Sequence, residues 1–91
     1  MVPILTHADF QRLTPREREV ALLIGHGEET KRIARILNLS TKTVETHRLK
    51  IQRRLGLYHP QALQQIMAIY VYRMGPDVSP LPPPEAPDTP S

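Results

Sequence analysis

The stretch STKTVETHRLKIQRRLG, residues 40–56, has the pattern of one helix held on a single side. Ser40 is a suitable N-cap, because its hydroxyl can accept a hydrogen bond from a free first-turn amide, that of Thr43. Gly56 readily adopts the left-handed conformation that ends many helices. We therefore predict a helix over 40–56 that is buried along one narrow apolar stripe, formed by Val44, Ile51 and Leu55.

The other faces of this predicted helix are polar and mostly cationic. A helix that packs on one side and is cationic on the others suits the major groove of DNA. The alternative is an ordinary surface helix whose charges are solvated. The polar residues are Lys42, Thr43, Glu45, Thr46, His47, Arg48, Lys50, Arg53 and Arg54.

The composition limits the other classes of protein. A chain of 91 residues allows one small domain. The lack of cysteine excludes disulfides, thiolate metal sites and thiol nucleophiles. Apolar runs are too short to cross a bilayer, and the N-terminus has no signal-peptide pattern, so we predict a cytoplasmic protein. Without paired carboxylates, a Cys/His nucleophile or a glycine-rich phosphate loop, we predict no enzyme and no cofactor. We also predict no metal, because His7, His26 and His59 are scattered.

Charge is distributed unevenly along the chain. The formal net charge is +3. Residues 1–75 contain all twelve lysines and arginines and six acidic residues, a formal charge of +6, whereas Asp77, Glu85 and Asp88 give the remainder −3. A domain of charge +6 favours a polyanion as partner.

A strong helix-start signal lies at residues 14–17, TPRE. Thr14 can act as N-cap, Pro15 fits the first helical position, and Glu17 can close a capping box. We expect this helix to end near residues 26–27, His-Gly, and to bury Val20, Ala21, Leu23 and Ile24.

A second helix is predicted over residues 30–38, and a short turn joins it to the helix at 40–56. The small Ala34 lets two helices cross closely, as a tight helix-turn-helix requires. Leu39 is expected to fill the turn from the core side. The inward residues are Ile33, Ala34 and Leu37, and the outward ones are Lys31, Arg32 and Arg35.

A fourth helix is predicted from Pro60 to residue 73 or 74. It is apolar over most of its circumference, and such a helix is either buried or paired with another chain. We interpret the apolar residues in excess of one buried stripe as a homodimer interface. The alternative is a terminal helix that closes the core of its own chain. The residues assigned to the dimer interface are Leu63, Ile66, Met67 and Tyr70.

The ends of the chain differ in composition from this central part. Residues 1–11 form a lead-in, and residues 12–74 form the predicted domain. Residues 75–91 hold seven of the ten prolines and are predicted to be disordered or polyproline-like. A proline-rich tail can bind in an aromatic groove of a partner protein. The simpler interpretation is a tail that binds no partner.

The segments LTPREREV, residues 13–20, and GHGEETKRIARILNLSTKTVETHRLKIQRRLG, residues 25–56, resemble the LuxR/GerE-type helix-turn-helix domain. The resemblance covers about residues 12–74. It implies an all-α, four-helix domain of a bacterial transcriptional regulator, which would be nucleoid-associated in the cytoplasm. It also implies that the third helix enters the major groove of DNA and that the second helix lies across the DNA backbone. The fourth helix often forms a dimer in this family.

The resemblance assigns DNA-facing positions to individual residues. Glu45 can accept a hydrogen bond from a cytosine amino group, and the Thr46 methyl can touch a thymine methyl. Lys42, Lys50 and Arg53 are better placed for phosphates, which set register without reading sequence. The full DNA-facing set is Thr30, Lys31, Lys42, Thr43, Glu45, Thr46, Arg48, Leu49, Lys50 and Arg53.

The chain departs from the family pattern at three positions. Glu29 replaces the usual serine cap, so either its carboxylate or Thr30 is expected to cap the second helix. Arg32 replaces an acidic residue and adds positive charge. Leu49 stands where polar residues are common, and it could press on thymine methyls or meet a protein. His47, between core and groove, is expected to be packed and hydrogen-bonded.

The sequence therefore predicts a DNA-binding transcriptional regulator that acts as a homodimer on two half-sites of double-stranded DNA. The alternative is a protein-binding co-regulator, similar to region 4 of sigma factors, that contacts RNA polymerase or another regulator. In that alternative the protein partner would be bound by the apolar fourth helix, Leu49 and the proline-rich tail. The chain could also be a piece of a larger regulator.

Overall fold

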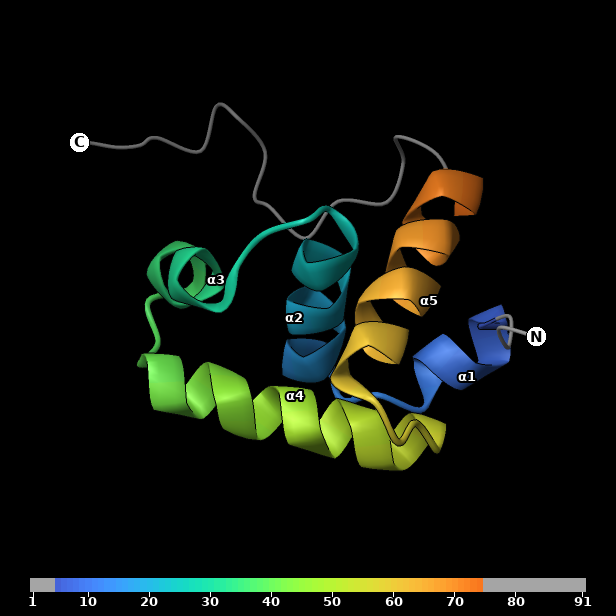
Figure 1. The fold of residues 1–91 in the computed structure, drawn as a ribbon, viewed down its shortest axis with the longest axis horizontal. Helices are drawn as coiled ribbons and strands as arrows, with labels where there is room; N and C mark the ends of the chain where they lie inside the picture. Colours follow the sequence, from blue (N-terminus) through green and yellow to red (C-terminus); the bar gives the residue numbers. More distant parts are fainter. Residues whose placement is uncertain (1–4, 75–91) are drawn as a thin grey trace.

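The computed structural model describes residues 5–74, and all regular structure within this range is helical. The first four residues and the predicted proline-rich tail lie outside the described residues. The helices are α1 (His7–Gln11), α2 (Pro15–Gly25), α3 (Thr30–Leu37), α4 (Thr41–Leu55) and α5 (Pro60–Met74), as Figure 1 shows. The predicted all-α fold is confirmed.

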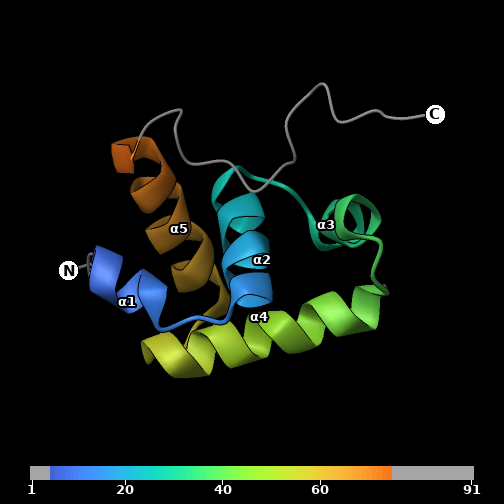
Figure 2. The same ribbon diagram turned by 180° about the vertical axis from the view of Figure 1, so that it is seen from behind.

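The long helix α4 forms one side of the molecule. Helices α2 and α5 stand side by side across it, α3 lies near its N-terminal end, and no other helix lies beyond it in either view (Figures 1 and 2). The main packing partners of α2 are α5 and α4, and α3 packs mostly on α4. One long surface of α4 therefore remains uncovered by the other helices.

Local capping explains where the predicted helices begin and end. Thr14 Oγ1 accepts from the Glu17 amide at 3.1 Å, and Glu17 Oε1 accepts from the Thr14 amide at 3.0 Å, which completes the predicted capping box. Ser40 Oγ accepts from the Thr43 amide at 3.0 Å, and Gly56 is left-handed with φ 69°. The predicted caps of α2 and α4 are confirmed.

The start of α3 differs from the prediction. Glu29 occupies the N-cap position with an extended backbone, but its side chain makes no capping hydrogen bond, and α3 begins at Thr30. Neither of the two expected caps is formed. Asn38 caps the C-terminal end of α3 with a left-handed φ of 58°, a conformation that asparagine tolerates better than most residues.

A single core lies between the helices. The predicted inward residues of α2, α3 and α4 are buried in it, whereas Leu37, Leu39 and Leu55 are partly buried and pack against its edge. The exposed residues on the outward side of α4 take no part in this core. The largest fully buried side chains are Val20, Leu23, Ile24, Ile33, Val44, Ile51, Leu63 and Met67.

Helix α1 is an element that the sequence pattern does not predict. Thr6 and Asp9 form a capping box at its start, and the hydrogen bonds from Thr6 lower the pKa of the Asp9 carboxyl. The ring of Phe10 stacks on that of Tyr70 with centroids 4.8 Å apart, and His7 Nδ1 lies 3.3 Å from the Tyr70 hydroxyl. Five-residue α1 therefore covers part of α5.

The residues assigned to the dimer interface need a correction. Leu63, Ile66, Met67 and Tyr70 are at most 5% exposed in the single chain. The prediction assumed that this chain could not wrap its own fourth helix. Helices α2 and α1 do so, from the two sides of α5 (Figure 1), and the four side chains are core residues.

Candidate nucleic-acid interface

The outward surface of α4 carries most of the predicted DNA-facing residues. Val44 and Ile51 are fully buried on the opposite side and anchor the helix to the core. Leu49, in the middle of the outward surface, is 54% exposed. The residues of the outer surface, all exposed, are Lys42, Thr43, Glu45, Thr46, Leu49, Lys50 and Arg53, and we call this set the α4 face.

The start of α3 comes close to the middle of α4. An open pocket of about 320 Å³ is lined by residues of both helices: Thr30, Glu45, Arg48, Leu49 and Gln52. A second pocket, of about 420 Å³, is bordered by Thr30, Lys31 and Arg48 together with the α2–α3 connection and Gln64. The residues of α3 and α4 that are predicted to contact DNA thus lie close together at one junction, between the start of α3 and the middle of α4.

Burial gives Arg48 a distinct environment at this junction. It is partly buried, unlike the exposed Lys50 and Arg53. Burial lowers the pKa of the Arg48 guanidinium, and the nearby Glu45 carboxylate opposes this shift. Because an arginine keeps its charge over the physiological range, Arg48 places a fixed cation between α3 and α4.

The cationic side chains fall into two groups, those that take part in ion pairs and those that do not. The described part of the chain contains four ion pairs, and they engage Arg12, Arg16, Arg32 and Arg54. Arg32 pairs with Glu28 at 3.6 Å, so part of its expected extra charge is compensated. Within residues 5–74, the cations of α3 and α4 that take part in none of these pairs are Lys31, Arg35, Lys42, Arg48, Lys50 and Arg53.

The N-terminus of α3 adds to the positive potential of this side. No side chain caps its first amides, since the Glu29 side chain makes no capping bond. Free first-turn amides and the helix dipole favour an anion at such an end. With Lys31 exposed in the first turn, this helix end is suited to a phosphate.

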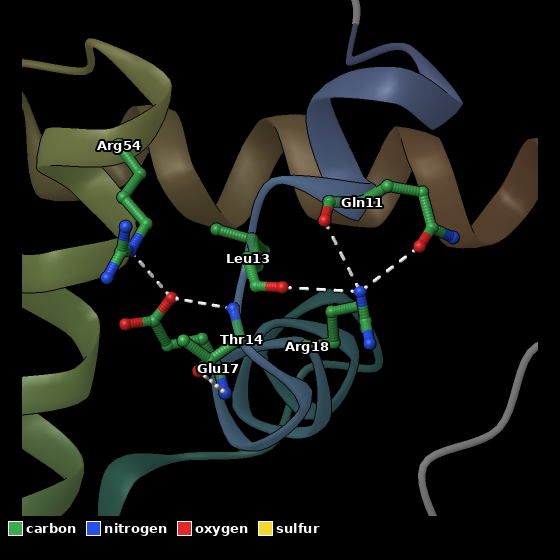
Figure 3. A network of polar contacts seen from close by, with 6 residues as sticks. All are labelled: Gln11, Leu13, Thr14, Glu17, Arg18 and Arg54. Carbon is green, nitrogen blue, oxygen red and sulfur yellow. Dashed lines mark hydrogen bonds and ion pairs between the residues drawn. The ribbon is translucent and has the colours of Figure 1, made fainter.

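An ion pair between a buried carboxylate and a half-exposed arginine, which the sequence pattern does not reveal, connects α4 to α2. Glu17, only 2% exposed, accepts from Arg54 Nε at 2.9 Å through the same Oε1 atom that caps the Thr14 amide (Figure 3). The pair links the start of α2 to the last turn of α4. The polar pattern placed Arg54 among the outward cations, but its partner lies on another helix, and local spacing carries no signal for it.

Arg18 makes a similar link between α2 and the segment before it. Its guanidinium donates to the carbonyl and side-chain oxygens of Gln11 and to the Leu13 carbonyl, at 3.4, 3.1 and 3.2 Å (Figure 3). The connection between α1 and α2 is thereby tied to α2. Arg18 is thus engaged structurally and lies outside the α4 face.

His47 is partly buried at the edge of α4, as expected. Its Nδ1 atom is buried and has no hydrogen-bond partner among the described residues, so the expected hydrogen bond is absent at this atom. Over residues 5–74, no group of three or more histidine or acidic side chains is placed to hold a metal ion. None of the helices in that range is long and apolar enough to cross a membrane.

Comparison with known proteins places the chain in a family. Residues 11–67 match the model of the bacterial regulatory proteins of the luxR family, GerE. This match covers more than half of the chain. The chain therefore belongs to the luxR family of bacterial regulatory proteins, and the predicted resemblance is confirmed.

Individual relatives are regulatory proteins as well. The Escherichia coli protein YgeK, named as an uncharacterized response regulatory protein, is 51% identical over 52 residues, which are 57% of this chain and 35% of YgeK. The tetrathionate response regulatory protein TtrR of Salmonella typhimurium is 39% identical over 46 residues, 50% of this chain and 22% of TtrR. The transcriptional regulatory protein MctR of Rhizobium johnstonii is 44% identical over 45 residues, 50% of this chain and 21% of MctR.

The chain thus spans about a third or less of the length of these relatives. No solved structure matches the chain significantly.

Proposed function

We propose that this chain binds double-stranded DNA as a transcriptional regulator in the cytoplasm, with α4 in the major groove. The observation that carries the proposal is the α4 face: an exposed helix surface whose lysines and arginine take part in none of the ion pairs described for residues 5–74. Cations without carboxylate partners can neutralise phosphates and release counterions. Membership in a family of regulatory proteins supports the same function.

Each part of the interface has its own proposed role. Lys42 near one end of α4, and Lys50 and Arg53 toward the other, contact phosphates on the two sides of the groove and set the register of the helix. Glu45, Thr46 and Leu49 lie between them and face base edges. Thr30, Lys31 and Arg48 hold a phosphate at the start of α3, and Thr43 supports the first turn of α4.

Lys50→Ala tests the phosphate contacts. The variant should weaken binding to specific and random duplexes alike and reduce the slope of log K against log salt by about one unit. The matched control is Arg73→Ala, which removes an exposed cation from the last turn of α5 and should leave the slope unchanged. A slope that is equal in wild type and Lys50→Ala would remove Lys50 from the interface.

We propose further that the chain forms a homodimer through the exposed side of α5. Ile69 is 41% and Tyr72 86% exposed, and at helical spacing they continue a stripe with Gln61, Gln65 and Ala68, which are also exposed. Two-fold pairing of this surface would present two α4 helices to two half-sites, and two weak contacts would then act together.

Ile69→Lys tests the dimer. Since Ile69 lies outside the core, the variant should keep the unfolding temperature of the wild type, sediment as a monomer, and bind a full site less tightly. The matched control on the same helix is Met74→Lys, because Met74 is exposed and its neighbours at helical spacing, Tyr70 and Val71, lie outside the stripe. An unchanged sedimentation profile for Ile69→Lys would exclude this side of α5 as the interface.

The second candidate function is protein binding, in which the same surface contacts RNA polymerase or another regulator. The observation in its favour is Leu49, an apolar side chain 54% exposed in the middle of the α4 face, which a protein partner could cover. An ionic-strength series separates the two candidates. Phosphate-driven binding falls steeply with salt, whereas an apolar protein contact changes little.

A further inference from the structure

Leu49 is an apolar side chain that the fold does not need. Val44 and Ile51 supply the fully buried contacts of α4, while Leu49 points outward with 54% of its surface in water. Its neighbours one turn away on the α4 face are Glu45 and Arg53. A single exposed leucine is common on protein surfaces, so the inference depends on the position of Leu49 in the middle of the α4 face, between Glu45 and Arg53.

Glu45 is the acidic member of the same face. It forms none of the ion pairs among residues 5–74 and lines the same pocket as Leu49. A carboxylate brought toward DNA is repelled by phosphates unless it accepts a hydrogen bond from a base. In the major groove the cytosine amino group has an acceptor on one side only, the O6 atom of the paired guanine, whereas the adenine amino group lies between two acceptors, its own N7 and the O4 atom of the paired thymine, which both repel a carboxylate. Glu45 therefore favours cytosine.

The distance between the two side chains limits which bases they reach. Residues four apart on a helix are separated by about 6 Å along its axis. Successive base pairs are about 3.4 Å apart. The base that faces Leu49 therefore lies within two steps of the base that faces Glu45. The group that an apolar side chain recognises in the major groove is the thymine methyl.

We propose that Leu49 and Glu45 together read a short pyrimidine-containing step, with Leu49 on the methyl group of a thymine and Glu45 on the amino group of a cytosine within two base pairs of it. The proposal rests on the proposed DNA-binding function and adds the chemistry of the half-site. Leu49 is in this view a specificity-determining residue, which makes the protein sensitive to a single methyl group.

Replacement of thymine by uracil removes only that methyl and tests the proposal directly. Starting from a duplex selected from random sequence, each thymine is replaced singly by uracil, and the dissociation constants of wild type, Leu49→Ala and Leu49→Met are measured. One methyl contributes an amount that corresponds to about a fourfold change in affinity. In wild type, one thymine per half-site, within two base pairs of a required cytosine, should lose about fourfold in affinity when it is replaced by uracil.

The variants identify the residue that senses the methyl. Leu49→Ala should bind the thymine and uracil duplexes equally at that position, and Leu49→Met, which keeps an apolar side chain, should retain the difference. Thr46→Ser, which removes the other methyl-contact candidate on the face, should leave the effect at this position unchanged. Thermal unfolding confirms that the exposed substitutions leave the fold intact.

Three results would overturn the proposal. If the chain binds the selected duplex with a steep salt dependence but no uracil position depends on Leu49, the half-site inference is wrong and the proposed function stands. If Leu49→Ala leaves every duplex affinity unchanged, Leu49 does not face bases and its surface is left for a protein. If no duplex is bound in a salt-dependent manner, the inference and the proposed function both fail.

Discussion

A single buried carboxylate connects the beginning of the fold to its candidate interface. Glu17 Oε1 accepts from the Thr14 amide at 3.0 Å and from Arg54 Nε at 2.9 Å, while the Glu17 amide donates to Thr14. A buried carboxylate is tolerated only when such partners compensate its lost hydration. The carboxylate that caps the start of α2 is thereby also bonded to the last turn of α4.

Glu17→Gln should destabilise the protein by about 1–3 kcal/mol, because the buried Glu17 side chain loses its charge-assisted hydrogen bonds with Arg54 and the Thr14 amide. The measurement is the free energy of unfolding from urea titration. Glu19→Gln is the matched control, since Glu19 pairs with Arg16 on the surface, where both side chains are nearly half exposed, and a change below about 0.5 kcal/mol is expected. Equal losses of unfolding free energy in the two variants would show that the buried Glu17 contributes no more to stability than the exposed Glu19.

At the scale of helices, the crossing of α2 and α5 depends on a missing side chain. A Cβ added at Gly25 would lie 2.5 Å from the Met67 carbonyl oxygen and 2.7 Å from Val71 Cγ2. The backbone of α5 therefore lies directly against the last residue of α2. This close approach, together with the Phe10–Tyr70 stack on the other side, turns an apolar helix into a core element.

Gly25→Ala should separate α2 from α5 and cost about 1–3 kcal/mol of unfolding free energy, as overpacking of a core does. Gly27→Ala separates this effect from backbone strain. Gly27 has a φ of 88° and no atom within 4 Å of an added Cβ, so only the conformational cost of about 1 kcal/mol is expected there. Thermal and urea unfolding of both variants provide the comparison. A stability of Gly25→Ala equal to that of wild type would mean that the two helices can move apart without loss.

At the scale of the whole chain, charge is divided between two parts. Residues 1–74 hold twelve cationic and six acidic residues, a formal charge of +6, and residues 75–91 hold three acidic residues and no lysine or arginine. The net charge of the molecule determines how strongly it is drawn to a polyanion over distances of about a Debye length. The acidic C-terminal part is therefore expected to weaken the attraction that the cationic part exerts on DNA.

Removal of residues 76–91 should raise the affinity for random duplex about two- to tenfold at low salt, because it removes three negative charges. The gain should vanish above about 0.5 M salt, where such charges are screened over a few ångströms. Fluorescence anisotropy over a salt series measures both effects. The control is the full chain with Asp77, Glu85 and Asp88 changed to the corresponding amides, which should reproduce the gain; a gain seen only on truncation would point to a cause other than charge.

The sequence by itself determined the class of fold, the limits of α2 to α5 within about two residues, and the residues of the α4 face. Capping signals such as Thr14 and Ser40 and the helical spacing of Val44 and Ile51 act between residues close in the chain, and these are the interactions that a local pattern encodes. The family motifs depend on the same local order.

Only the tertiary structure decided which side of α5 is buried, where Leu63, Ile66, Met67 and Tyr70 are core residues. It also decided that Arg54 is engaged by Glu17. The cations of the α4 face, in contrast, take part in none of the ion pairs described for residues 5–74. The apolar pattern of α5 is the same whether α1 and α2 or a second chain covers it. Burial and charge pairing join residues far apart in the chain, and their outcome depends on how the helices pack, which periodicity within one helix does not contain.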